Sequence, residues 1–548
     1  MTAQQQLEDA IEKYWPSACQ FWSPFILLSS PTHISGQKAI AQIHMGNRQV
    51  SLNADIIKKS ELFDCIEALL AHEVGHHVRY PGTLAVDARM RILERSLIPL
   101  DDFSTTNLFT DFMINEFLGQ KLKDQLIKIY QSFEHHHSWK NDPSFIFYLA
   151  LYEMLWNLPE GSMMGKAAED FSKHFPGYRA EASLLVDQLF TMEPNIYTQF
   201  IYFVSVISRY IKPIKGDKPK QENGSCQQDQ PTPEDWADAL FPNAREKQAI
   251  DKAVEKGWIS KEDAESITDL DKRISSLPGV FNNNADQVPE IMAAYYRREA
   301  DRYLVCPPST SIQGEAIVPT TLEEWEPGEN TRDIDWLASY IQRGESLGTA
   351  LPFKRHQISE TEGFEEPFWR PKMEIYLDVS GSMPDPRCTR NAMTLAAQIL
   401  ATSAIRKGGW VRALLYSHEH VKYWSWLRSE LEISKFLMHY MGGGTQYPFD
   451  VLENSLTECG NEQPIRVVIT DHDFLMNFKE YKGAEYLVAE AAEKSNPLIL
   501  LLDESCSDCE TQRFRALGAE VISIKEMEDF PYMAGKLSQV LFENRLNK

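Results

Sequence analysis

The chain has no excess of basic residues. Its 548 residues include 55 Lys and Arg against 79 Asp and Glu, which gives a formal net charge of −24. A surface of this sign repels the phosphates of nucleic acids and of anionic lipid headgroups. We therefore expect no nucleic-acid partner, and we expect the proteins that bind this chain to present basic surfaces.

Long hydrophobic runs are also absent. The most apolar stretch, residues 145–158, contains Glu153 and is shorter than the ~20 residues that a membrane-spanning helix needs. Residues 1–9 are polar and have no signal-peptide character. The eight cysteines are scattered, and the close pair Cys506 and Cys509 has no second pair with which to bind zinc. Free thiols and the missing export signal predict a cytoplasmic protein without a membrane span.

The stretch IYLDVSGSM at residues 375–383 is the strongest local pattern in the chain. Its apolar run predicts a buried parallel strand, and the Gly and Ser residues that follow end that strand. Asp378, Ser380 and Ser382 therefore stand on a loop at the carboxyl end of a strand, where open α/β sheets bind ligands. Carboxylate and hydroxyl oxygens suit a hard cation such as Mg²⁺ or Mn²⁺.

Two downstream segments offer further oxygen ligands for this cation. Thr445 follows three glycines at 442–444, and Asp471 ends a second apolar run, VVIT at 467–470. With Asp378, Ser380 and Ser382, these residues resemble in order and spacing the metal-ion-dependent adhesion site of von Willebrand factor A (VWA) domains. The resemblance implies a Mg²⁺ ion that binds an acidic side chain presented by another protein.

The region around this site has the sequence pattern of a doubly wound sheet. Predicted helices, for example 394–407 and 485–494, alternate with predicted strands, and 421–426 is expected to form an edge strand. One departure from the VWA pattern is His472, which stands where a glycine is common; it affects the outer shell of the site rather than its ligands. The strands are expected at 375–379, 410–416, 465–470, 498–502 and 520–524.

A second motif, His72-Glu73-x-x-His76, lies in a helix predicted from about Ser60 to just before Pro81. Residues four apart share one face of a helix, so both imidazoles can bind one Zn²⁺, with Glu73 placed to take a proton from the zinc-bound water. Short predicted strands at 38–44 and 49–52 precede this helix. The order resembles the zincin metallopeptidases, particularly small cytoplasmic ones that share a chain with a VWA domain.

The third zinc ligand is expected on a helix covering residues 107–116. Asn107, Asp111 and Asn115 recur every four residues and share its polar face. A carboxylate among apolar neighbours is costly to bury unless it is paired or bound to metal. The stretch resembles the downstream helix of VWA-linked metallopeptidases, which places the third ligand at Asp111. Glu116 and Asp87 are the alternatives.

These motifs predict a multidomain chain. Residues 1–213 are expected to form a mainly α zincin-like domain and 371–548 a C-terminal α/β VWA domain. The polar, Pro- and Gly-containing segment 214–234 is predicted to be a flexible linker, and 235–370 a helical and extended connector. The cluster Glu134-His-His-His137 is expected to be a polar surface, because consecutive helical residues point in different directions.

The resemblance implies that the chain works with a MoxR-type AAA+ ATPase. The chain contains no G-x-x-x-x-G-K-[ST] phosphate loop, so that ATPase is expected to be a separate protein. The expected function is a zinc metallopeptidase for a protein or peptide substrate, coupled to a Mg²⁺-dependent docking domain. The alternative is a non-catalytic adaptor of the ATPase, in which the zinc fold is structural or inactive.

Overall fold

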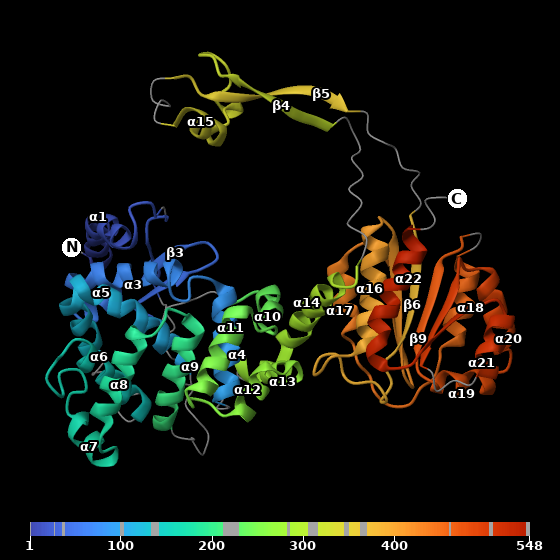
Figure 1. The fold of residues 1–548 in the computed structure, drawn as a ribbon, viewed down its shortest axis with the longest axis horizontal. Helices are drawn as coiled ribbons and strands as arrows, with labels where there is room; N and C mark the ends of the chain where they lie inside the picture. Colours follow the sequence, from blue (N-terminus) through green and yellow to red (C-terminus); the bar gives the residue numbers. More distant parts are fainter. Residues whose placement is uncertain are drawn as a thin grey trace. The chain divides into compact units, whose positions relative to one another are not determined.

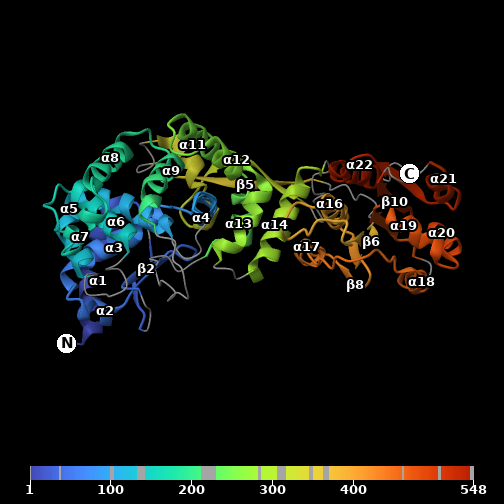
Figure 2. The same ribbon diagram turned by 90° about the horizontal axis from the view of Figure 1, so that it is seen from below.

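The chain is mostly helical, with a six-stranded α/β region toward its carboxyl end (Figure 1 and Figure 2). Both views are of a computed structural model. None of the helices in the described part of the chain combines the length and the apolar character that crossing a bilayer requires. The described residues are 2–26, 28–35, 39–98, 104–132, 142–211, 230–281, 285–304, 316–344, 350–361, 370–459, 462–503 and 508–543.

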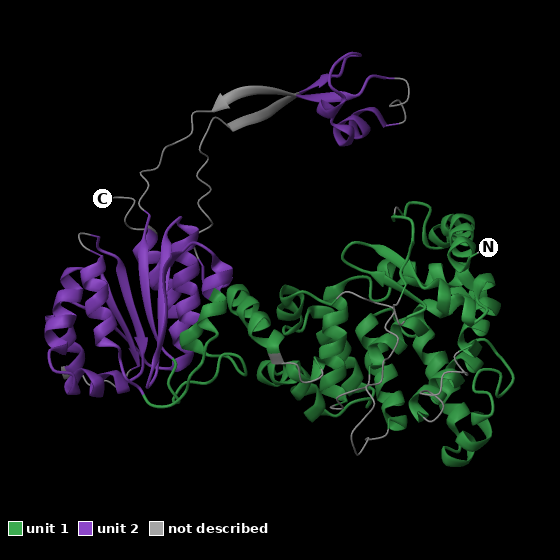
Figure 3. Ribbon diagram, turned by 180° about the vertical axis from the view of Figure 1, so that it is seen from behind, with its two compact units in different colours: residues 1–299, 379–394, 434–444 green, residues 300–378, 395–433, 445–548 purple. Residues whose placement is uncertain are grey.

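These residues form two compact units (Figure 3). The predicted boundaries at 213, 234 and 370 stay predictions. Most of the linker, residues 212–229, and the cluster Glu134-His-His-His137 lie outside the described residues. Unit 1 comprises Met1–Glu299, Val379–Thr394 and Ser434–Gly444, and unit 2 comprises Ala300–Asp378, Leu395–Ile433 and Thr445–Lys548.

A small sheet and a group of helices open unit 1. Strands β1 (Thr32–His33), β2 (Ala41–His44) and β3 (Gln49–Leu52) form a sheet in the order β1-β3-β2, and β2 and β3 pair antiparallel as expected of the two predicted strands. The predicted helix start at Ser60 is wrong. A short helix α2 (Ala54–Lys59) and a 3-10 turn come first, and the motif helix α3 begins at Ile66.

Helix α5 (Thr105–Ser132) divides the apolar interior of this part of unit 1. Ile114 and Leu118 pack with α1 (Ala3–Trp22), the small sheet and α3 (Ile66–Val78), whereas Phe109 and Phe112 pack with the helices that follow. A helix buried on two sides keeps only a narrow polar edge, and Asp111 and Asn115 occupy it. The following helices are α6 (Pro143–Leu155), α7 (Ala167–His174), α8 (Tyr178–Thr191) and α9 (Ile196–Ile207).

Buried ion pairs hold the later helices of unit 1 to α4 (Leu84–Leu97). Glu246, which is fully buried, pairs with Arg89 at 3.2 Å and with Arg273. Both partners matter, because a buried carboxylate is stable only when its charge is compensated. Glu246 lies on α11 (Ala244–Glu255) and Arg273 on α13 (Leu270–Val280). The other helices of this part are α10 (Pro233–Ala239), α12 (Lys261–Thr268) and α14 (Val288–Asp301).

The segment 379–394 of unit 1 is tied to α13 and α14. The Tyr296 hydroxyl accepts a hydrogen bond from the backbone N–H of Asn391 at 2.8 Å. Asp271 accepts one from the Thr389 hydroxyl at 2.7 Å. Hydrogen bonds to two helices therefore fix the path of the loop that follows Ser382.

The large sheet of unit 2 has the strand order β11-β10-β9-β6-β7-β8. All neighbours pair in parallel except β8, which runs antiparallel to β7 at the edge. The predicted strands and the predicted edge strand are confirmed. They are β6 (Lys372–Asp378), β7 (Trp410–Tyr416), β8 (His420–Leu427), β9 (Ile465–Thr470), β10 (Leu498–Asp503) and β11 (Glu520–Ile524).

Helices cover both faces of this sheet, as Figure 1 shows. Tyr376, Leu414 and Val468 face one side, where they pack with apolar residues of the covering helices. Their neighbours along each strand point to the other side because strand side chains alternate. One face is covered by α18 (Phe449–Glu458), α19 (Asp473–Glu480), α20 (Ala484–Glu493) and α21 (Asp508–Ala516), and the other by α16 (Ala392–Arg406), α17 (Glu430–Leu437) and α22 (Phe530–Glu543).

A two-stranded hairpin completes unit 2. Strands β4 (Ala316–Glu324) and β5 (Phe353–Thr361) pair antiparallel, and the connection between them carries the short helix α15 (Trp336–Arg343). Two segments of the connector predicted at 235–370 therefore form β-strands.

A buried charge cluster joins three strands of the large sheet. Glu374 on β6 contacts Arg412 on β7 at 2.5 Å and Arg466 on β9 at 2.9 Å, and all three side chains are at most 4% exposed. The Ser455 hydroxyl also donates to Glu374 at 2.8 Å. Although burial opposes ionisation, the two arginines hold the pKa of the Glu374 carboxyl below its usual range.

Replacing Glu374 by Gln is expected to destabilise the protein by about 3–5 kcal/mol, because it leaves two buried guanidinium groups without a counter-charge. The measurement is the free energy of unfolding of the full chain in urea. Glu485→Gln, which removes one partner of the exposed Arg513 pair, is the control and should change stability little. Equal effects of the two substitutions would contradict this account of Glu374.

Candidate metal centres

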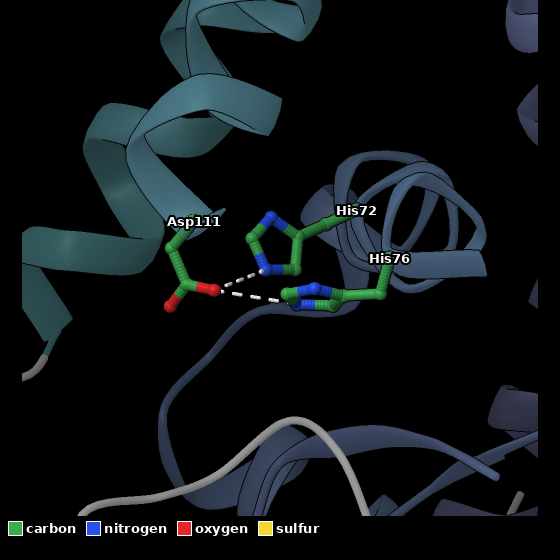
Figure 4. Close-up of side chains that lie close together, drawn as sticks. All are labelled: His72, His76 and Asp111. Atoms are coloured by element: carbon green, nitrogen blue, oxygen red, sulfur yellow. Dashed lines mark ion pairs between the residues drawn. The ribbon is translucent and has the colours of Figure 1, made fainter. Parts of the chain in front are cut away.

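Helices α3 and α5 bring His72, His76 and Asp111 together (Figure 4). Oδ1 of Asp111 lies 3.5 Å from Nε2 of His72 and 3.3 Å from Nε2 of His76. The side chains are 11%, 1% and 16% exposed, respectively, so the cluster lies at the edge of the interior. Both imidazoles come from one face of α3 and the carboxylate from α5, as the four-residue spacing predicts for the histidines.

Gly75 allows this close packing. A Cβ atom at this position would lie 2.6 Å from Cζ2 of Trp22 and 2.8 Å from Cγ2 of Ile114. Trp22 also donates its indole N–H to the carbonyl of Ala71 at 2.7 Å. Helices α1 and α5 therefore press on α3 at the residue between the two histidines, which fixes the distance between α3 and Asp111.

The second nitrogen of each imidazole has a partner that can only accept. Nδ1 of His76 lies 2.9 Å from the backbone carbonyl oxygen of Tyr80. Nδ1 of His72 lies 2.9 Å from Oδ1 of Asn115, whose amide nitrogen is occupied as a donor to two tyrosines. In the neutral form of each ring Nδ1 therefore carries the hydrogen, and the Nε2 atoms of both rings face Asp111. Metal-binding histidines are commonly oriented by such outer partners.

The two histidines keep the Asp111 carboxyl in its ionised form. Burial raises the pKa of the Asp111 carboxyl, but His72 and His76 outweigh burial and hold this pKa well below its usual range. Burial lowers the pKa of His72, and the Asp111 carboxylate overcomes this effect and raises it to about 9. Asp111 is therefore ionised, which is the form of a carboxylate that binds metal.

The donor set fits a zinc ion. A tetrahedral site with metal–ligand distances of 2.0–2.1 Å separates its ligand atoms by about 3.3 Å, close to the spacings around Asp111. Nε2 of His76 and Oδ1 of Asp111 are buried, and neither forms a hydrogen bond of acceptable geometry with any described residue. Catalytic zinc sites also use two imidazole nitrogens and one carboxylate oxygen as their three protein ligands, and they leave the fourth position open.

The alternative ligands lie outside this cluster. Within the described residues, neither Glu116 nor Asp87 belongs to the group of ligand atoms around the two histidines. Asp87 is buried beside Arg91 at 2.9 Å, and burial raises the pKa of Glu116 against the opposing charge of Arg79. Glu73, the expected general base, is buried on α3, and its charge helps to raise the pKa of His72.

Three tyrosines behind His72 were not anticipated. Asn115 donates to the hydroxyls of Tyr130 at 3.0 Å and Tyr152 at 2.9 Å, and Tyr148 lies 2.8 Å from Tyr152. Burial raises the pKa of all three phenols, so they remain protonated. Asn115 itself could be found from its spacing after Asp111. No sequence signal joins it to Tyr130, which lies beyond the kink of α5 at Leu122, or to Tyr148 and Tyr152 on α6.

The second candidate centre begins at the carboxyl ends of β6 and β9 in unit 2. Asp378 ends β6, and its Oδ2 accepts a hydrogen bond from the Thr470 hydroxyl at 2.8 Å at the end of the neighbouring strand. Asp471 follows directly and is buried, with Oδ1 accepting from the backbone N–H of Asp473 at 2.9 Å. The parallel pairing of β6 and β9 thus places two carboxylates at one edge of the sheet.

The other three predicted ligands lie on loops. In unit 1 the Ser380 and Ser382 hydroxyls are 3.0 Å apart, and the N–H of Gly381 donates to the carbonyl of Gly443 at 2.7 Å. In unit 2 the backbone carbonyl of Thr445 accepts from Asn477 at 3.0 Å, whereas its Oγ1 is buried without a hydrogen bond from the described residues. Such a hydroxyl, together with carboxylates, fits a hard cation.

His472 gives this edge of the sheet an added imidazole. It is 56% exposed, with Nε2 3.4 Å from Asp473 and Nδ1 3.8 Å from Asp503. Asp471, His472 and Asp473 offer ligand atoms within 4.8 Å of one another. His472, which replaces the usual glycine, therefore lies among carboxylates at the protein surface.

Comparisons with known proteins give only distant similarities. No family model matches the chain, and no curated protein matches it. A solved structure of von Willebrand factor type A from Catenulispora acidiphila is 13% identical, with a TM-score of 0.25, over 31% of this chain and 42% of that chain. The match thus spans less than half of the Catenulispora structure.

A second similar structure is an aerotolerance-related membrane protein from Bacteroides fragilis with multiple mutations to serines. It is 11% identical, with a TM-score of 0.22, over 31% of this chain and 98% of that chain. Neither TM-score supports an argument about function, so the two candidate centres depend on their own geometry.

Asp111→Asn is expected to weaken zinc binding by more than the 10–100-fold that losing an outer partner of a ligand typically costs. Asn115→Ala should fall within that 10–100-fold range, because it frees His72 without removing a ligand. The measurement is the zinc dissociation constant by competition with a chelator. Glu116→Gln and Asp87→Asn are the matched controls; a larger loss in either of them than in Asp111→Asn would identify a different third ligand.

Proposed function

We propose that the cluster of His72, His76 and Asp111 holds a zinc ion and that the protein is a metallopeptidase. The observation that carries the proposal is that two imidazole Nε2 atoms, each fixed by a bond at Nδ1, converge on one buried carboxylate oxygen. Zinc in such a site would supply Lewis acidity and lower the pKa of a water molecule to about 7.

The residues of the chain then have separate tasks. Asn115 and the Tyr80 carbonyl keep the two imidazoles in the orientation that directs Nε2 toward Asp111 and the proposed ion. Glu73, one residue after His72 and buried on the same helix, is the group proposed to accept the proton of the attacking water. The substrate class is a protein or peptide, since this constellation suits attack on an amide carbonyl.

For the second centre we propose Mg²⁺-dependent docking. The ligands would be Asp378, Ser380, Ser382, Thr445 and Asp471, which are all oxygen donors, and Mn²⁺ has the same preference. An ion held in this way keeps coordination positions for a carboxylate from another protein. The proposed partner is a MoxR-type AAA+ ATPase on a separate chain, whose ATP-driven motion would deliver or release the substrate protein.

Glu73→Gln separates the peptidase from the adaptor alternative. Hydrolysis of a quenched fluorescent peptide library should fall by about 10²–10⁴-fold, because the amide cannot accept the proton. Zinc content and the unfolding temperature should stay as in the wild type. Absence of hydrolysis by the zinc-loaded wild type, or a cellular effect that survives Glu73→Gln, would favour the non-catalytic adaptor.

Asp378→Ala tests the docking site alone. Association with a MoxR-type ATPase of the same organism, measured by calorimetry in excess Mg²⁺, should be lost in this variant and in the wild type after chelation. The zinc content should not change. Asp450→Ala, an exposed carboxylate on α18, is the control. Unchanged association of the Asp378 variant would remove the docking role.

A further inference from the structure

Helix α15 presents its apolar face outward. Trp336, Leu337, Tyr340 and Ile341 are 60%, 70%, 67% and 70% exposed, respectively. At 100° per residue these positions fall on one arc of the helix, so four large apolar side chains form one continuous face. Single exposed apolar residues are common on proteins, but a contiguous patch of this kind marks a binding surface.

The polar side of α15 is fastened to the β4–β5 hairpin. Asp335 caps the helix by accepting from the N–H of Ala338 at 2.9 Å. The buried Ser339 hydroxyl accepts from the backbone N–H of Phe353 at 2.7 Å and donates to the carbonyl of Asp335. Arg343 lies over the ring of Phe353 at 4.5 Å and pairs with Glu324. These contacts hold the helix in the orientation that leaves its apolar face exposed.

The surroundings of this face are acidic. Between Leu322 and Gly344 the sequence has six acidic residues and two arginines. Glu323, Glu324, Glu326, Glu329 and Asp333 are all exposed. Glu324, Glu329 and Asp335 already pair with Arg343, Lys354 and Arg355, but the six acidic residues still outnumber these three basic residues and Arg332. A partner therefore gains if it is apolar opposite the helix and basic around it.

Two other occupants fit this face poorly. A second copy would bring two acidic rims together in a chain whose net charge is already −24, and directly opposed like charges destabilise an interface. A bilayer fits poorly too, because interfacial helices carry Lys and Arg on the polar side to approach anionic lipids.

We propose that the face formed by Trp336, Leu337, Tyr340 and Ile341, called here the α15 face, docks into an apolar groove with a basic rim on a partner protein. Laying an amphipathic helix into a groove is a common mode of peptide recognition, with anchors one turn apart. Trp and Tyr are the residue types that most often dominate such interfaces. The proposal is independent of both metal centres.

The experiment starts with the full chain in its own cells and a photo-crosslinking phenylalanine derivative at Leu337. The same derivative at Leu184, 57% exposed on α8, is the control. A protein crosslinked from Leu337 and not from Leu184 is then purified, and its dissociation constant for the unmodified full chain is measured at low and high salt. Capture alone decides nothing until this second step.

The expected result is that Trp336→Ala weakens binding roughly tenfold or more. Tyr340→Ala should weaken it, whereas Tyr486→Ala, 71% exposed on α20, should not. The paired substitution Glu326→Gln and Asp333→Asn should weaken binding and reduce its dependence on salt. Crosslinks to another part of this chain, to a second copy or to lipid would overturn the proposal. So would the absence of a crosslink, or affinities that neither Trp336→Ala nor salt changes.

Discussion

The orientation of two imidazole rings is the constraint on which the site in unit 1 depends. His72 and His76 can present Nε2 to Asp111 only because Asn115 and the Tyr80 carbonyl each take Nδ1 as a donor. That orientation needs α3 and α5 at close range, which the missing side chain of Gly75 permits. Asp111 and Asn115 are one turn apart on α5. A single helix therefore supplies both a proposed zinc ligand, Asp111, and the residue that orients His72, Asn115.

The two candidate centres follow from two kinds of local structure. On α3 the helical repeat places two nitrogen donors side by side, and these two histidines keep the Asp111 carboxyl ionised despite its burial. At the large sheet, parallel pairing of β6 and β9 places Asp378 and Asp471 at one edge, where only oxygen donors are at hand. Nitrogen and oxygen donors favour different ions, so one chain can hold a proposed catalytic ion and a proposed docking ion without competition between them.

Much of this could be predicted from short-range sequence patterns. The alternating apolar runs predicted the strands of the large sheet, and the four-residue spacing of His72 and His76 predicted their shared face.

What could not be predicted depends on contacts between distant segments. Tyr130, Tyr148 and Tyr152 have no spacing that connects them to Asn115. The start of α3 was misplaced because the short α2 ends beside Ser60 and a 3-10 turn follows it before α3 begins. The outward apolar face of α15 could not be predicted, because an amphipathic pattern does not indicate which side of the helix packs on the hairpin.

Anomalous diffraction at the zinc absorption edge, from crystals of the full chain grown with zinc, tests the central claim most directly. The account predicts a peak within about 2.0–2.2 Å of Nε2 of His72, Nε2 of His76 and a carboxylate oxygen of Asp111, with Nδ1 of both rings still bonded to Asn115 and to the Tyr80 carbonyl. A zinc peak bound through Nδ1, a peak at Glu116 or Asp87 instead of Asp111, or no peak at this cluster at saturating zinc would contradict it.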